Sequence, residues 1–331
     1  MKTARPKKRE SSKTTKLSVV VPVYNEQETV GFLIERLVAV LAALTKLYQI
    51  VFVNDGSADR TYEIISHAAA ENPNIHIIDL SRNFGHQTAV AAGLAYAIGD
   101  AVIVMDGDLQ DPPELIPDFV QKWREGYQVV YAVRAERKEN VLKRSAYKAF
   151  YRTLHRFADI EIPLDSGDFG LMDRCVVETI NAMPERNRFV RGLRSWVGFR
   201  QIGLPYSRDA RYAGDSKYSL AKLMKLAVDG LLSFSTAPLK IATAIGFVIS
   251  FFSFLGIIFY LCLFLITPRV PGFTTLIIIL LFIGGVQLLT VGILGEYIGR
   301  IYEESKHRPM FVVRETINTQ HKGELLNESK N

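Results

Sequence analysis

Residues 17–26, LSVVVPVYNE, join a continuous apolar run to a polar cluster. An unbroken apolar run is typical of a strand in a parallel sheet, because helices cover both faces of such a strand. From Val30 to Leu44 apolar residues then recur at helical spacing. This stretch therefore predicts a strand, a polar loop and a helix, which is the first unit of an α/β fold.

The same order repeats over the next 80 or so residues. Further strands are predicted at 50–53, 75–80 and 101–105, with a helix from about 87 to 98. Ser57 is predicted to N-cap the helix that follows the second strand. Repeated strand–helix units predict a parallel sheet with helices on both faces.

Polar clusters stand where the predicted strands end. They are Tyr24–Glu26, Asn54–Ser57, Arg82–His86 and Asp106–Asp111. Ligands of such sheets bind beyond the carboxyl ends of the strands, so we expect the four clusters to converge on one site. An Asp-x-Asp pair is common in turns. At this edge, however, Asp106 and Asp108 suit a hard divalent ion, Mg²⁺ or Mn²⁺, that bridges a diphosphate.

Two apolar runs near the C-terminus predict a transmembrane hairpin. Residues 241–266 and 273–294 contain no charged side chain, and the six residues TPRVPG connect them. The first run is about 39 Å long as a helix, enough to cross a bilayer core of about 30 Å with tilt. Basic residues flank the pair, and the connecting loop has only Arg269. Both termini are therefore predicted to be cytosolic, with the chain in the inner (cytoplasmic) membrane.

Composition narrows the remaining classes of function. The net charge is +6, and the first 16 residues hold seven lysines and arginines against one acid, which predicts a flexible basic tail. Attraction to anionic lipids suits such a tail better than nucleic-acid binding, since no reader motif follows it. Two cysteines and six scattered histidines allow no disulfide framework and no zinc site.

Five ordered motifs give the chain a specific resemblance. They are VPVYNE (21–26), VNDGS (53–57), SRNFG (81–85), DGDLQDPPE (106–114) and RYAGDSKYS (211–219). Together they resemble family 2 glycosyltransferases of the GT-A fold, a Rossmann-like α/β fold. Within that family the chain is similar to bactoprenol glucosyltransferases and, more distantly, to dolichyl-phosphate mannose synthases. The similarity runs from about residue 17 to 313 and includes EYIGRIYEE (296–304).

The resemblance implies an activity and a domain plan. It implies inverting transfer of a hexose, most readily glucose, from a UDP-sugar to undecaprenyl (polyprenyl) phosphate, for later glycosylation of lipopolysaccharide or the cell wall. Mannose or a 4-amino-pentose stays open as the sugar, and a homo-oligomer, a tetramer, is expected. The expected parts are a tail (1–16), the GT-A domain (17–216), amphipathic juxtamembrane helices (217–238), two transmembrane helices (239–298) and a cytosolic segment (299–331).

The resemblance also implies roles for individual residues. The donor nucleotide would be held by Pro22, Tyr24, Asn25, Glu26, Asp55, Gly56, Ser57 and Asp106. The metal ligands would be Asp106, Asp108 and Gln110. Phosphate would be bound by Arg134, Arg211 and Lys217. The residues expected to be catalytic are Asp106, Asp108, Asp168, Arg211 and Lys217.

The acceptor's chemistry agrees with part of this assignment. A lipid phosphate lies at headgroup depth, and Arg211 and Lys217 stand where the soluble domain meets the predicted membrane segment. Snorkelling at the interface is the alternative for Lys217. No strong general base is expected, because a phosphate oxygen is already anionic and can attack the anomeric carbon directly. Alignment and charge stabilisation would then supply the rate.

One segment departs from the mannose synthases. In SGDFGLMDR (166–174), Gly170 stands where those enzymes commonly have an arginine that helps to hold phosphate. This favours the bactoprenol branch. Asp168 is expected to orient the sugar or a phosphate-binding arginine, or else to cap a helix.

Two rival functions fit the sequence less well. A processive polysaccharide synthase would need more membrane spans and a Gln-x-x-Arg-Trp element, whereas this chain has Arg194-Ser195-Trp196 without that glutamine. An inactive membrane scaffold would not need Asp106, Asp108, Gln110 and Lys217. Transfer to a lipid phosphate remains the preferred hypothesis.

Overall fold

The computed structural model describes residues 15–134, 166–185, 188–206, 237–266 and 272–319. These residues divide into two compact units. The first contains the described residues up to 206 together with 309–319, and the second contains 237–266 and 272–308. Each unit is described by itself.

An eight-stranded sheet organises the described part of the first unit, in the order β7-β5-β6-β4-β1-β2-β3-β8. The strands are β1 (Leu17–Val23), β2 (Tyr48–Asn54), β3 (Ile75–Leu80), β4 (Ala101–Val104), β5 (Val129–Arg134), β6 (Ser166–Asp173), β7 (Gln201–Tyr206) and β8 (Val313–Ile317). The four strands predicted from the sequence are therefore present.

The predicted parallel sheet is confirmed for the four predicted strands, and it forms the centre of a larger mixed sheet. Strands β1 to β4 are parallel to their neighbours among themselves. However, β6 lies antiparallel between β4 and β5, and β8 lies antiparallel to β3 at the edge. Neither strand has the unbroken apolar run that marks a central parallel strand, since β6 reads SGDFGLMD and β8 reads VRETI. Sheets of this kind often carry antiparallel strands outside a parallel centre.

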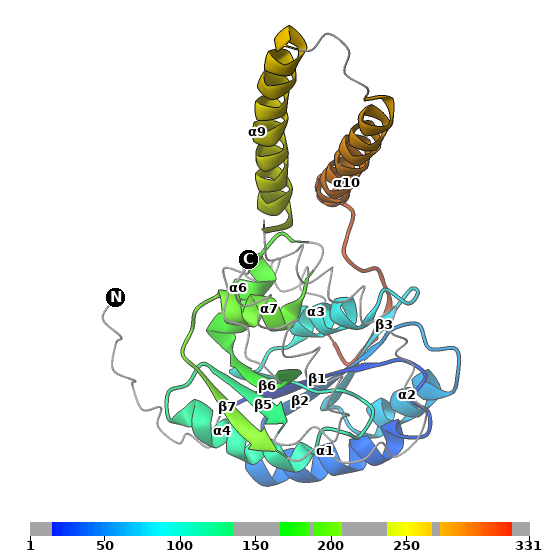
Figure 1. Cartoon of the computed structure of the whole chain (residues 1–331). Helices are drawn as coiled ribbons and strands as arrows, with labels where there is room; N and C mark the ends of the chain where they lie inside the picture. Colours follow the sequence, from blue (N-terminus) through cyan, green and yellow to red (C-terminus); the bar gives the residue numbers. More distant parts are fainter. Residues whose placement is uncertain (1–14, 135–165, 186–187, 207–236, 267–271, 320–331) are drawn as a thin grey trace, which may run out of the picture. The chain divides into compact units, whose positions relative to one another are not determined.

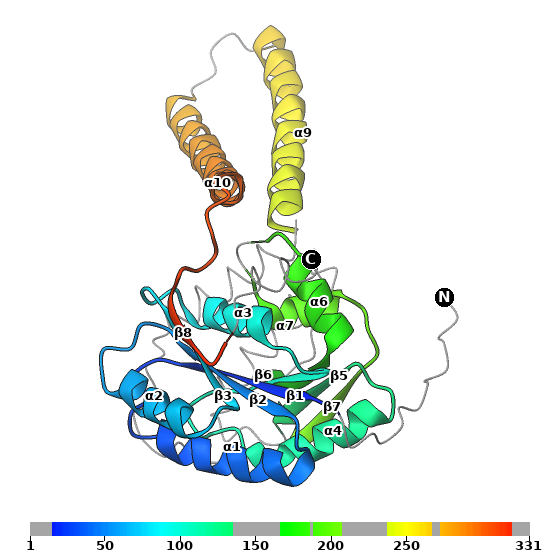
Figure 2. The same cartoon turned by 180° about the vertical axis from the view of Figure 1, so that it is seen from behind.

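Helices cover both faces of the sheet, as predicted (Figures 1 and 2). One face carries α1 (Val30–Leu44), α2 (Thr61–Glu71) and α4 (Ile116–Arg124), with the short η1 (Pro113–Leu115) leading into α4. The other carries α3 (His86–Tyr96), α6 (Arg174–Ala182) and α7 (Val190–Trp196). The prediction that Ser57 caps α2 is wrong, because Asp59 Oδ1 accepts the Thr61 N–H at 3.0 Å instead.

The apolar side chains predicted for α1 form the core beneath the sheet. Leu33, Leu37 and Leu41 are completely buried and belong to one cluster with Phe52 and Phe119. Each such side chain stabilises the fold by about 1.5–3 kcal/mol through burial. This packing fixes the sheet and, with it, the edge at which the polar clusters lie.

Helix α3 approaches the sheet closely at Gly93. A Cβ atom on Gly93 would lie 2.2 Å from Val20 Cγ1 and 3.1 Å from Val53 Cγ2. We expect Gly93→Ala to destabilise the protein by about 1–3 kcal/mol, because overpacking outweighs the gain in helix propensity. Gly31→Ala is the matched control, since no atom lies within 4 Å of its added Cβ. Thermal unfolding followed by intrinsic fluorescence checks both variants, and equal midpoints would contradict the close approach.

The second unit contains two long helices, α9 (Ala237–Ile266) and α10 (Phe273–Ser305). Their large apolar side chains are widely exposed, for example Phe247 at 74% and Leu288 at 76%. In the described residues, Phe282–Ser305 is the helical stretch that is long and apolar enough to cross a membrane. A second span and the hairpin topology remain predictions. Most of the predicted amphipathic segment at 217–238 and of the basic tail at 1–16 lies outside the described residues.

Candidate active site at the carboxyl edge of the sheet

The loops after β1 and β2 are joined by hydrogen bonds. Asn25, which has a φ of 55°, donates its N–H to Ser57 Oγ at 3.0 Å. In return, Asn25 Oδ1 accepts the Ala58 N–H at 2.8 Å. Asparagine tolerates this left-handed conformation better than most residues. The first two polar clusters therefore form one surface.

Asp55 ties the third cluster to the second. Its two carboxylate oxygens accept the N–H groups of Phe84, at 2.7 Å, and Gly85, at 3.0 Å. Burial raises the pKa of Asp55 above its usual value, although these backbone donors oppose the shift. Gly56 lies against the same loop with a φ of 70°, and a Cβ there would come within 2.7 Å of Arg82 and Asn83 backbone atoms. Only glycine fits that approach.

Thr29 links Glu26 of the first cluster to Gly107 of the fourth. Thr29 Oγ1 donates to Glu26 Oε2 at 2.8 Å and lies 3.2 Å from the carbonyl oxygen of Gly107. The expected convergence of the four clusters is thus confirmed in the described residues. Tyr24 lies at the same edge with 45% of its surface exposed, whereas Pro22 is paired with Val53 inside the sheet.

The Asp-x-Asp turn follows β4 directly. Leu109 has a φ of 58°, an uncommon conformation for a branched side chain, and the Gln110 N–H donates to Asp108 Oδ1 at 3.2 Å. Asp111 is buried and accepts the Tyr206 hydroxyl at 2.7 Å. These contacts fix the turn that carries Asp106, Asp108 and Gln110.

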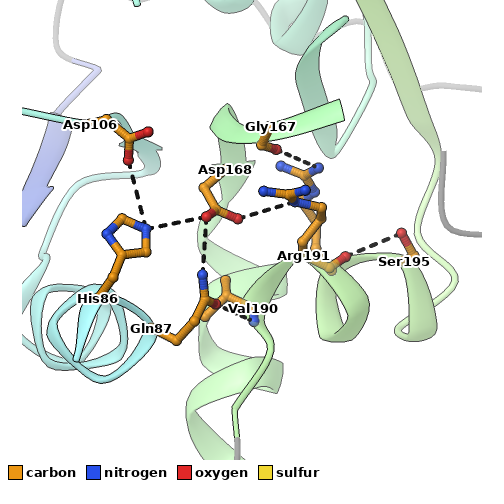
Figure 3. A network of polar contacts seen from close by, with 9 residues as sticks. His86, Gln87, Asp106, Gly167, Asp168, Val190, Arg191 and Ser195 are labelled. Atoms are coloured by element: carbon orange, nitrogen blue, oxygen red, sulfur yellow. Dashed lines mark hydrogen bonds and ion pairs between the residues drawn. The ribbon is translucent and has the colours of Figure 1, made fainter. Parts of the chain in front are cut away.

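Figure 3 shows a row of alternating charges that runs from this turn to α7. His86 Nε2 lies 3.7 Å from Asp106 Oδ1 and donates to Asp168 Oδ2 at 3.2 Å. On the far side, Arg191 Nε donates to Asp168 Oδ1 at 3.3 Å. The order is therefore Asp106, His86, Asp168, Arg191, with the sign of the charge changing at each step.

The protonation states agree with that order. Burial by itself lowers the pKa of His86, but the hydrogen bond to Asp168 and the charges of both aspartates overcome it and raise the pKa to about 9. Burial raises the pKa of Asp106 to about 6, against the opposing charge of His86. Burial also acts to raise the pKa of Asp168, yet Arg191 and His86 hold it well below its usual range. At neutral pH, His86 is a cation between two carboxylates.

Asp168 is the most firmly held member of the row. Gln87 Nε2 donates to Asp168 Oδ2 at 3.0 Å, while Gln87 Oε1 accepts the Val190 N–H at the start of α7 at 2.9 Å. The helix-cap alternative for Asp168 is wrong, because it lies inside β6 and the cap of α6 is Asp173. The other expectation was that Asp168 orients the sugar or a phosphate-binding arginine. Asp168 does contact Arg191, while phosphate binding by Arg191 and a contact with the sugar stay predictions.

The structure leaves no room for an arginine side chain at position 170, where the mannose synthases commonly have one. A Cβ on Gly170 would lie 2.6 Å from the Val130 carbonyl oxygen and 3.3 Å from Arg194 Nη1. Arg194 reaches this position from α7 and is 3% exposed, and its guanidinium lies 5.2 Å from the centre of the Tyr131 ring. Burial lowers the pKa of Arg194 to about 10, so it remains charged at neutral pH.

Three members of the network have no place among the predicted site residues, namely Gln87, Arg191 and Arg194. His86 was expected at this edge only as the end of the cluster Arg82–His86, without a role of its own. The available signals were the position of His86 and Gln87 directly after SRNFG and the spacing of the arginines in RFVRGLRSW (188–196).

Other predicted residues are not placed in this site. Arg134 ends β5 opposite Tyr206 in β7, and its side chain is not described. Arg211 and Lys217 lie outside the described residues. Within the described ranges, no three His, Cys, Asp or Glu side chains gather closely enough to hold a metal by themselves.

Comparisons with known proteins agree on the family. The model of "Glycosyl transferase family 2" matches residues 18–180. The chain is 47% identical to an uncharacterized glycosyltransferase, YkcC, of Bacillus subtilis, over 94% of this chain and 97% of the relative. It is 43% identical to the bactoprenol glucosyl transferase of Shigella phage SfV, over 90% of this chain and 98% of the relative.

A solved structure similar to this one is glucosyl-3-phosphoglycerate synthase from Mycobacterium tuberculosis, in complex with Mn²⁺, uridine diphosphate and phosphoglyceric acid. The TM-score is 0.44 at 20% identity, over 66% of this chain and 78% of that one.

Proposed function

The chain belongs to glycosyl transferase family 2 and is a glycosyltransferase, and we propose that it transfers glucose from UDP-glucose to a polyprenyl phosphate at a membrane surface. The relative named as a bactoprenol glucosyl transferase covers nearly its whole length and supports this acceptor and this sugar. The observation that carries the proposal is the row Asp106, His86, Asp168 and Arg191 at the carboxyl edge of the sheet.

The loops after β1 and β2 form the donor site in this proposal. Tyr24 offers a half-exposed aromatic face on which a uracil can stack, an interaction worth about 1–3 kcal/mol for a base. The turn from Asn54 to Ser57 lies beside it, held by Asn25 and by the loop that Asp55 binds. A nucleotide here places its diphosphate toward the Asp-x-Asp turn.

A divalent metal fits this turn. Asp106 Oδ1 is buried and accepts no hydrogen bond, so it has lone pairs to offer to a cation. Asp108 and Gln110 follow on the same turn with further oxygen ligands, the type that Mg²⁺ and Mn²⁺ prefer. When bound with the donor, the metal would neutralise the charge that develops on the departing diphosphate.

The chain's own cations complete the charge balance. Protonated His86 is 43% exposed at its side chain and faces the same turn, so it can bind a phosphate oxygen. Asp168 holds His86 in place, and Arg191 in turn holds Asp168. An oxygen of the acceptor phosphate would attack the anomeric carbon as the bond from that carbon to UDP breaks. UDP would leave with the electron pair, and the anomeric centre would invert.

The exposed apolar helices support a membrane-bound acceptor. Side chains such as Phe252 and Leu288 on α9 and α10 would be costly in water and suit a lipid environment. We propose two spans with the catalytic domain and both termini in the cytosol, in the cytoplasmic membrane. Arg211 and Lys217 are proposed to bind the lipid phosphate.

Membranes that contain the protein should form a lipid-linked sugar from undecaprenyl phosphate and one of a panel of nucleotide sugars. UDP-glucose is expected to give the highest yield, measured by thin-layer chromatography of the organic phase. Glycerol 3-phosphate as the acceptor is the control, because it has the phosphate without the lipid. If no donor gives a lipid product, or if the soluble acceptor works equally well, the proposed acceptor is wrong.

A further inference from the structure

Strand β8 brings the segment after α10 back to the catalytic sheet. It pairs with the edge strand β3, with Ile77 opposite Ile317 and Asp79 opposite Glu315. The pairing continues across the sheet, since Asp79 pairs with Asn54 on β2 and Asn54 pairs with Val23 on β1. The C-terminal strand therefore lies two strands from the turn that we assign to the donor.

A break in the register between β3 and β8 directs the side chain of Arg314 toward Asp79. Leu80 pairs with Val313 and Asp79 with Glu315, so Arg314 is an extra residue between two paired positions. Such a bulge turns its side chain away from the regular alternation. Arg314 Nη1 donates to Asp79 Oδ2 at 3.2 Å and its Nη2 to the Ser81 carbonyl oxygen at 2.9 Å.

Asp79 links Arg314 to Asn54, the first residue of the proposed donor turn. It is 2% exposed, and a buried carboxylate is costly without partners. Its Oδ1 accepts Asn54 Nδ2 at 2.7 Å, and because a carboxylate only accepts, this fixes the orientation of the Asn54 amide. Asn54 Oδ1 then accepts the Ser57 N–H at 3.2 Å, inside the turn.

We propose that Arg314 is a positioning residue for the donor: through Asp79 and Asn54 it holds the turn from Asn54 to Ser57 in the shape that binds the nucleotide. The inference rests on the proposed function in taking this turn as part of the donor site. In this proposal, β8, which follows the apolar helices in the sequence, helps to hold the donor site in shape. Because the Arg314 side chain is 60% exposed, solvent screens its charge and the expected effect is moderate.

Arg314→Ala in the full-length protein in detergent should raise the KM for the sugar nucleotide about fivefold and change kcat less than about twofold. Deuterium exchange of the peptide over 54–59 should become faster, since the Ser57 amide loses its fixed acceptor. Arg314→Lys should restore part of both properties, because lysine keeps the charge and one donor.

Tyr62→Phe is the matched control. The Tyr62 hydroxyl donates to Glu315 Oε2 at 2.9 Å, so it also ties β8 to the domain, but this contact does not lead to Asn54. It should leave KM and exchange at 54–59 unchanged. Equal effects of the two variants, or none in Arg314→Ala, would overturn the proposal. If the wild type uses no donor, the proposed function fails, and exchange at 54–59 alone then decides the role of Arg314.

Discussion

Replacing Asp108 by alanine is expected to reduce sugar transfer by about a thousandfold, with the protein still inserted in the membrane. The reason is that the departing diphosphate would lose a ligand of the cation that neutralises it, and removal of one such stabilising group typically costs a factor of a hundred to a thousand or so. Turnover of UDP-glucose at saturating Mn²⁺, with undecaprenyl phosphate as the acceptor, measures the effect.

Asp118→Ala is the control for that variant. Asp118 is exposed in the first turn of α4, near the Asp-x-Asp turn in sequence but outside the network of contacts at the site. It should retain nearly full activity. Unchanged turnover of Asp108→Ala with Mn²⁺ present would contradict the assignment of Asp108 as a metal ligand.

The central strands and the site's edge were predictable because their signals are local. A run such as LSVVVPV, apolar except for Ser18, marks a buried strand wherever it occurs, and β1 has the bounds expected for it. A polar cluster after each strand then places Asn25, Asp55 and Asp106 at one edge, by topology alone. Each of these inferences needs only a few neighbouring residues.

The remaining features depend on contacts between distant segments. Strand β8 pairs with β3 across more than 230 residues, as the Arg314–Asp79 contact shows, and its five residues VRETI carry no strong strand pattern. Likewise, His86 and Arg191 acquire their roles only when α3 and α7 meet at Asp168. No spacing rule along the chain connects such residues, so the sequence alone could not pair them.

Asp168→Asn is expected to lower transfer by about a hundredfold, because it leaves His86 and Arg191 without the charge that holds them. Removing one partner of a buried ion pair generally costs more than the pair's net contribution. Asp100→Asn is the matched control, since the Asp100 carboxylate accepts the exposed Lys16 N–H and interacts with Arg174, outside the row that joins Asp106 to Arg191.

A double-mutant cycle separates positioning from direct contact with substrate. If Arg191 acts by holding Asp168, Arg191→Gln should impair the wild type strongly and the Asp168→Asn variant only a few-fold further. Full additivity of the two losses would show that Arg191 contacts substrate independently of Asp168. The kcat/KM values of the four proteins give the coupling directly.

Asp168→Asn should also change how the stability of the fold depends on pH. The pKa of His86 is raised to about 9 in the folded protein, so its pairing stabilises the fold fully below its unfolded value near 6.5 and is lost as the pH rises toward 9. The pKa of Asp168 is lowered, so its contribution is present above its unfolded value near 4 and is lost in more acidic solution. The difference in Tm between wild type and Asp168→Asn should therefore be largest at about pH 5–6 and shrink between pH 6.5 and 9. Thermal melts in a chelator, which keeps metal from competing for Asp106, test this, and a difference that stays constant up to pH 9 would show that His86 is not the cation held by Asp168.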